Sequence, residues 1–212
     1  MYTNQKREVR EEYYYLLEER ERRLSEEKYK YFIPHKWQEE IIRATNDYRE
    51  IMMSKGNRVG GTLLTMFCAW LWSCGWYDKI GFQWNGRRFE YPTRGLIIGY
   101  SADQLRGATQ KILMGEGKPW GTGHINNCYP IMPKELADKC DIMMSRQNSG
   151  CIDFIRVPFL TGGLSTILMM TQNQDFGTIM GDEFDWVIYD EFIYKPLLYS
   201  QVRTRTFDRK GI

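Results

Sequence analysis

A glycine-rich stretch, SKGNRVGGT from Ser54 to Thr62, carries the strongest chemical signal in the chain. It follows a short apolar run, 50–54, and precedes an apolar segment of helical length, 62–76. Glycines let backbone N–H groups approach phosphate oxygens, and the N-terminus of a helix adds a favourable dipole. The Thr62 hydroxyl could bind a magnesium ion. The stretch therefore predicts a phosphate-binding loop, although a plain glycine-rich turn with a capping threonine would use the same residues.

The positive charge of this loop stands in an unusual place. The common pattern is G-x-x-x-x-G-K-[ST]; Gly60 and Thr62 fit it, but Gly61 occupies the lysine position. The phosphate charge still needs a cation, and Lys55 at the start of the loop or Arg58 in its middle could supply it. The residues predicted to bind ATP in this loop are Lys55, Gly56, Asn57, Arg58, Val59, Gly60, Gly61 and Thr62.

Two acids follow an apolar run further along, in DWVIYDE. A nucleotide hydrolase needs one carboxylate to hold magnesium and another residue to orient the attacking water. Asp190 suits the first role and Glu191 the second. Acid pairs are common after strands, but this one lies downstream of a strand, glycine-rich turn and helix. The combination predicts a site for ATP and Mg²⁺.

A glutamine upstream of the loop could recognise the base. The amide of Gln38 can both donate to and accept from the edge of adenine, while Phe32 or Trp37 could stack on the ring. An ordinary helix residue is the alternative interpretation of Gln38.

The order of elements predicts an α/β fold, because apolar strand-like runs alternate with helical segments. Buried strands are expected at 50–54, 94–101 and 185–189, and helices at 62–76 and 102–114. CIDFIRV and LSTILMM are expected to form an antiparallel pair, Asn85-Gly86 a hairpin turn, and the tail TRTFDRKGI a basic turn. The expected sheet is mainly parallel and flanked by helices.

The N-terminal segment 6–30 carries 16 charges in 25 positions and predicts an amphipathic helix. Its apolar residues fall on one side at helical spacing: Val9, Tyr13, Leu16, Leu17 and Leu24. The helix could dock through this stripe and leave its other face solvated, or it could be an arm that contacts a partner subunit.

Other polar residues allow two interpretations each. Ser101 and Gln104 could contact DNA or nucleotide, or form a helix cap with an exposed glutamine. The acids before 185–189 could join the metal site or form a polar approach to the strand: they are Asp182, Glu183 and Asp185. The arginines of the tail could bind DNA phosphates, act across a subunit interface, or remain solvated: they are Arg203, Arg205 and Arg209.

Composition excludes several classes of protein. With 212 residues, 42% of them hydrophobic, the chain can form one globular domain with a substantial core. A net charge of +2 does not by itself argue for nucleic-acid binding. Five cysteines without a CxxC pair and only two histidines argue against zinc and for reduced thiols in a cytosolic compartment. We expect no signal peptide, because the N-terminus is charged throughout, and the longest apolar run, about 14 residues, is too short to span a bilayer.

Six segments occur in an order that resembles the large terminase subunit of tailed double-stranded DNA bacteriophages. They are PHKWQ, KGNRVGGT, YPTRGLIIGYSADQLRG, GTGHI, GLSTILMMT and GDEFDWVIYDE, and the resemblance spans roughly residues 30–210. It implies a P-loop NTPase fold of the ASCE, helicase- and terminase-like type. The family's ATPase motor packages viral DNA into a procapsid. The implied partners are double-stranded DNA, the portal protein, the small terminase subunit and further copies in a ring, in the host cytoplasm and not at a membrane.

The resemblance also implies a role for each matching residue. Some family members have the lysine at the start of the loop, so Lys55 takes the phosphate-binding role, and Arg58 matches a catalytic arginine associated with the γ-phosphate. Thr62 and Asp190 take the magnesium roles, Glu191 that of the catalytic glutamate, and Gln38 that of the adenine contact.

The expected organisation is a charged N-terminal helix, 1–30, and a P-loop ATPase domain, 31–212. The family's coupling motif and nuclease domain, which would follow the TRTFDRKG segment, are not in this chain, so we expect a truncated motor capable of slow ATP binding or hydrolysis. One alternative is a nucleotide-binding but inactive assembly module that contacts the portal or the small subunit. Another is a different helicase-like nucleic-acid ATPase.

Overall fold

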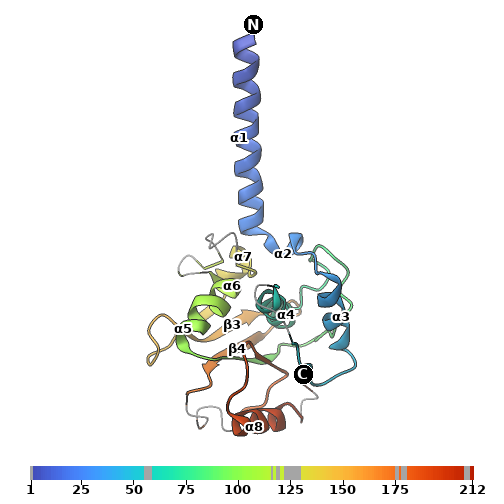
Figure 1. The fold of residues 1–212 in the computed structure, drawn as a ribbon, viewed down its shortest axis with the longest axis vertical. Helices are drawn as coiled ribbons and strands as arrows, with labels where there is room; N and C mark the ends of the chain where they lie inside the picture. Colours follow the sequence, from blue (N-terminus) through green and yellow to red (C-terminus); the bar gives the residue numbers. More distant parts are fainter. Residues whose placement is uncertain are drawn as a thin grey trace.

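A five-stranded sheet forms the centre of the protein (Figure 1). The computed structural model describes residues 2–54, 59–115, 117, 120–121, 130–174, 177, 181–207 and 211–212. Its strands are β1 (Arg94–Gly99), β2 (Asp141–Met144), β3 (Ile152–Pro158), β4 (Leu164–Thr171) and β5 (Trp186–Tyr189), in the order β2-β3-β4-β1-β5. β1 pairs in parallel with β4 and β5, while β3 pairs antiparallel with β4 and β2. The parallel centre and the antiparallel β3–β4 pair confirm the sequence predictions, whereas β2 was not predicted.

Alternating side chains of the central strand face two separate hydrophobic layers. Ile97 of β1 joins the large cluster built around α4 (Gly61–Cys74). Leu96 and Ile98 join a smaller cluster with α8 (Pro196–Phe207). The sheet is therefore buried on both faces, which explains why its central strands read as continuous apolar runs.

Helix α4 forms much of the main core. Trp70, Phe67 and Leu71 are fully buried. The helix follows Gly60, at φ 85°, and ends at Gly75, at φ 74°, which are conformations that glycine adopts without strain. This helix confirms the prediction for 62–76.

The predicted helix at 102–114 is present but is not α-helical throughout. It consists of α5 (Ala102–Gln104), the π-helical segment η1 (Leu105–Gln110) and α6 (Lys111–Met114). Such π-helical segments are rare and frequently accompany functional sites. The short helix α7 (Lys134–Ala137) was not predicted.

The charged N-terminal segment forms two helices, α1 (Tyr2–Glu26) and α2 (Lys28–Tyr31), and α1 projects from the body (Figure 1). Its expected docking stripe is exposed over its first part, where Val9, Tyr13 and Leu16 are 65%, 58% and 57% exposed, whereas Leu17 and Leu24 are half-buried. The end of α1 and the whole of α2 lie against the body. The interpretation of α1 as an arm for a partner stays a prediction.

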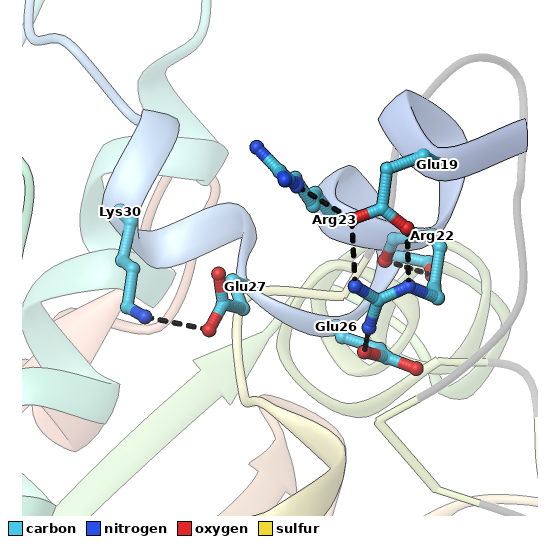
Figure 2. Close-up of polar contacts among 7 residues, drawn as sticks. Glu19, Arg22, Arg23, Glu26, Glu27 and Lys30 are labelled. Atoms are coloured by element: carbon cyan, nitrogen blue, oxygen red, sulfur yellow. Dashed lines mark hydrogen bonds and ion pairs between the residues drawn. The ribbon is translucent and has the colours of Figure 1, made fainter. Parts of the chain in front are cut away.

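Ion pairs between successive turns stabilise the base of α1 (Figure 2). Glu19 accepts hydrogen bonds from Arg22 at 2.8 Å and from Arg23 at 2.7 Å, and these contacts lower the pKa of Glu19 to about 2. Pairs at this spacing stabilise a helix surface without tertiary contacts. They support the helix at its base, and a further pair between Arg7 and Glu11 at 2.9 Å lies in the part that projects. In the described part of the chain, no helix combines the length and the apolar character needed to cross a membrane.

Helix α3 (Lys36–Ala44) is followed by residues 50–54, for which the sequence predicted a strand. This prediction is wrong. Residues 51–54 form no strand, and Met52 is 93% exposed. Glu50 instead accepts a hydrogen bond from Tyr199 of α8 at 3.1 Å and forms an ion pair with Arg203. These contacts attach the segment to α8, so its apolar residues do not join the sheet.

The hairpin predicted around Asn85-Gly86 is also wrong, because residues 80–92 form no strands. The backbone there bonds to the turn that follows α3. Arg87 N donates to Thr45 Oγ1 at 2.8 Å, and Asn46 Nδ2 donates to the Asn85 carbonyl at 2.7 Å. The prediction of a turn-like tail is wrong for residues 204–207, which are the last turn of α8, while residues 208–210 lie outside the described residues.

Candidate functional site at the carboxyl edge of the sheet

Asp190 is a buried acid at the carboxyl end of β5, and only 3% of it is exposed. Its Oδ2 accepts a hydrogen bond from Gln104 Nε2 at 2.7 Å and another from Thr109 Oγ1 at 3.0 Å. Its backbone N donates to the Ile98 carbonyl of β1 at 3.1 Å. The acid is therefore held by side chains from the segment that follows β1, and the next residue, Glu191, is exposed.

Gln104 links Asp190 to the end of β1. Ser101 Oγ accepts from the Gln104 backbone N at 3.2 Å, which confirms the predicted helix cap. The expectation of an exposed Gln104 is wrong, because its Oε1 accepts from Tyr100 N at 3.3 Å while its Nε2 reaches Asp190. Neither this partnership nor the contact of Thr109 with Asp190 was predicted from the sequence. The available signal was topological, since both residues follow a strand that neighbours β5.

Helix α4 runs from the carboxyl edge towards the amino edge of the sheet. Its last turns lie at the amino edge, where Thr93 Oγ1 donates to the Trp72 carbonyl at 3.1 Å, just before β1 begins. Leu160 N, before β4, donates to the Cys74 carbonyl at 2.9 Å. The helix also packs against η1, which carries the Asp190 partner Thr109. A rise of 1.5 Å per residue gives about 15 Å from Trp72 back to Thr62, close to the length of β1. The first turn of α4 is thus directed towards the edge that carries the two acids.

The four loop residues Lys55, Gly56, Asn57 and Arg58 lie outside the described residues, so their predicted phosphate contacts stay predictions. The rest of the loop leads into α4. Val59 is 42% exposed, Gly60 precedes the helix, Gly61 is its buried first residue, and Thr62 is half-buried in its first turn.

Gln38 is 1% exposed and connects α3 to the start of α4. Its Oε1 accepts from His35 N at 2.8 Å, and its Nε2 donates to the Gly60 carbonyl at 3.1 Å. This amide fixes the residue immediately before α4. Its predicted contact with adenine stays a prediction alongside this internal role.

A surface depression of about 780 Å³ lies between α3 and the loop. Its lining residues are His35, Lys36, Trp37, Glu40, Val59 and Gly60. Of the two aromatic residues considered for stacking on adenine, Trp37 lines this depression. Phe32 is buried and stacks on Phe67, with ring centroids 4.4 Å apart, so it belongs to the core.

The acids before β5 belong to the opposite edge of the sheet. Asp185 is fully buried, and its Oδ2 accepts from Arg94 N at 2.7 Å. Asp182 forms an ion pair with Arg94 at 2.8 Å. Five residues of extended chain separate Asp185 from Asp190, about 16 Å. Asp185 therefore cannot join a metal site at Asp190, and the polar-approach interpretation is confirmed for both Asp182 and Asp185.

The tail arginines in the described part have partners in the protein. Arg203 pairs with Glu50, and Arg205 Nη1 donates to the Asp182 carbonyl at 3.1 Å. These contacts attach α8 to neighbouring segments. Arg209 lies outside the described residues.

Within the described ranges, no group of three or more His, Cys, Asp or Glu side chains could hold a metal ion. Magnesium keeps several waters and binds through one or two carboxylates together with substrate phosphates. A hydroxyl and a carboxylate, as on Thr62 and Asp190, form an oxygen donor set that suits such an ion.

The parallel centre of the sheet and the helices on both of its faces define an α/β fold. A crystal structure of the large terminase from a thermophilic bacteriophage is similar in fold, with a TM-score of 0.51 over 82% of this chain. The similar region covers 36% of that terminase, and the sequences are 13% identical. No family model and no curated protein matches the chain.

Proposed function

We propose that this protein binds ATP with Mg²⁺ and hydrolyses it as the P-loop ATPase motor module of a phage terminase. The observation that carries the proposal is Asp190, buried and held by two side chains, beside the exposed Glu191. Both lie at the edge towards which the first turn of α4 is directed. Fold similarity to a phage large terminase supports the same assignment.

Each residue of the site has a defined task in this proposal. Thr62 and Asp190 would hold Mg²⁺, which when bound neutralises charge on the transferring phosphoryl group. Lys55, Arg58 and the amides of the loop would bind the phosphates, with Arg58 stabilising charge in the transition state. Glu191 would orient a water for in-line attack on the γ-phosphate.

The depression beside the loop is the proposed site of the base. Trp37 would stack on adenine there, because it lines the depression and Phe32 does not. Gln38 would contribute indirectly as well, by holding the Gly60 carbonyl and hence the start of α4.

The proposed work of this motor is the packaging of double-stranded viral DNA into a procapsid. Its partners would be the DNA, the portal protein, the small terminase subunit and further copies of the chain in a ring. The fold similarity to a phage large terminase supports this setting.

The decisive experiment is Glu191→Gln, which keeps the shape of the side chain and removes its charge. We expect phosphate release to fall on the order of 100-fold, the effect of losing one group that acts in the transition state. ATP affinity should stay within about twofold, because only interactions specific to the transition state are lost. Glu183→Gln is the matched control, since Glu183 is an exposed acid near the other end of the same strand. Equal turnover in both variants and the wild type would contradict the proposal.

A second candidate function is that of a nucleotide-binding assembly module without turnover. The exposed apolar stripe of α1 favours it, because a projecting helix with such a stripe suits contact with another protein. Binding of ATP with Mg²⁺, but phosphate release no faster than in Glu191→Gln, would select this candidate.

A further inference from the structure

Gln172 is a buried glutamine directly after β4 whose amide bonds to a distant backbone segment. It is 1% exposed. Its Nε2 donates to the Phe192 carbonyl at 2.9 Å, and its Oε1 accepts from Tyr194 N at 3.1 Å. One side chain therefore holds two points of the segment that begins immediately after Glu191.

The sheet topology makes this contact a bridge across the carboxyl edge. β1 lies between β4 and β5, and the backbone N of Gln172 donates to the Gly99 carbonyl at the end of β1 at 3.0 Å. The side chain continues past β1 to the chain that leaves β5. The ends of all three parallel strands are thereby connected through Gln172.

Glu191 consequently lies between two held points. On its N-terminal side, Asp190 is bonded by Gln104 and Thr109. On its C-terminal side, the backbone of 192–194 is bonded by Gln172. Residues 191–195 form neither helix nor strand, so this segment has no regular ladder of its own to fix its position.

The two bonds require an amide of this length. One atom must donate to a carbonyl and the other must accept from an N–H, and the side-chain amide of Gln carries both functions on one uncharged planar group. The partners are backbone atoms, so the contact does not depend on the side chains of Phe192 and Tyr194. Phe192 is in fact 81% exposed.

We propose that Gln172 is a positioning residue that sets where the Glu191 carboxylate stands relative to the site. This rests on the proposed function, in which Glu191 orients the attacking water. Gln172 itself would touch neither nucleotide nor water. Small displacements of such a group are costly, because a shift of about 1 Å can lower turnover about 100-fold.

Gln110 offers a matched control for a purely structural role. It is 2% exposed, its Oε1 accepts from Ile152 N at 3.0 Å, and its Nε2 donates to the Gly150 carbonyl at 3.2 Å. It is the same residue type with the same two-bond contact to a backbone segment. That segment leads into β3, away from the acid pair.

The experiment compares Gln172→Met and Gln110→Met in the full chain, with Gln172→Glu as a second variant. Gln172→Glu retains the acceptor for Tyr194 N and loses the donor for the Phe192 carbonyl. Turnover, ATP affinity, melting temperature and amide hydrogen exchange are measured for each.

We expect Gln172→Met to lower kcat on the order of 10- to 100-fold, with ATP affinity within about twofold. Exchange at the Tyr194 amide should accelerate. Gln110→Met should keep kcat within about twofold of the wild type, whatever its melting temperature.

The outcomes separate this inference from the proposed function. Wild-type turnover in Gln172→Met, or equal losses of kcat in the two methionine variants, overturns the positioning role and leaves the hydrolase assignment standing. A wild-type protein without turnover overturns the proposed function. For a protein without turnover, amide hydrogen exchange still tests the contact between Gln172 and the backbone of 192–194. Unchanged exchange at the Tyr194 amide in Gln172→Met overturns this contact, whereas exchange that accelerates in Gln172→Met and not in Gln110→Met supports it.

Discussion

Two buried aspartates stand at opposite ends of β5, and they differ in what surrounds them. Asp185, at the amino end, bonds to the backbone N of Arg94 and receives a hydrogen bond from Tyr91 Oη at 3.3 Å. Asp190, at the carboxyl end, bonds to the side chains of Gln104 and Thr109. Asp185 is fully buried and Asp190 is 3% exposed, so burial alone does not distinguish them.

The difference lies in the partners and in the next residue. Asp185 satisfies a backbone donor at the start of β1, and such a bond serves the joining of two strands. Asp190 adjoins an exposed glutamate, and its partners come from a segment that includes a π-helical turn. A buried acid at a strand end is therefore structural at one edge of this sheet and a candidate for chemistry at the other.

The largest effect on stability is expected for Asp185→Ala. The substitution leaves the Arg94 N without this carboxylate and removes a charge-assisted bond, which costs about 3 kcal/mol. Urea denaturation followed by circular dichroism measures the free energy of unfolding. ATP affinity of the folded fraction should stay at the wild-type value. A loss of affinity with unchanged stability would reverse the roles assigned to the two edges.

Asp190→Asn is expected to act on activity instead. The Asn carbonyl can still accept from Gln104 and Thr109, so the free energy of unfolding should change by less than about 1 kcal/mol. Removing the charge should lower magnesium-dependent phosphate release on the order of 100-fold, which corresponds to about 2.7 kcal/mol. Phosphate release is measured across a range of Mg²⁺ concentrations. A stability loss as large as that of Asp185→Ala would show that both acids are structural.

The smallest effects separate the hydroxyl partners of the two acids. Thr109→Val removes a buried donor to Asp190 and should lower both turnover and stability, the latter by about 1 kcal/mol. Tyr91→Phe removes a longer bond to Asp185 and should change stability by about 0.5 kcal/mol, with turnover unaffected. Thermal unfolding and phosphate release of the two variants are compared side by side. Similar turnover in both would mean that the contact between Thr109 and Asp190 has no part in the site.

Local sequence patterns correctly predicted those helices and strands whose apolar residues form one continuous run or one continuous buried face. The strand at 185–189, the helix at 62–76 and the antiparallel β3–β4 pair follow from apolar runs and their boundaries. The predictions of a strand at 50–54 and of a hairpin at Asn85-Gly86 were wrong, because these segments bond to other elements. Glu50 is attached to α8, and the backbone around residue 87 bonds to Thr45.

The sequence by itself determined the acid pair after an apolar strand and the glycine-rich entry to α4, because both are local in the chain. It also determined an α/β order of elements. Only the tertiary structure decided which residues hold that pair. Gln104 and Thr109 lie 86 and 81 residues before Asp190, and Gln172 lies 20 residues before Phe192. Such contacts arise when parallel strands align their carboxyl ends, and no periodicity along the chain records that alignment.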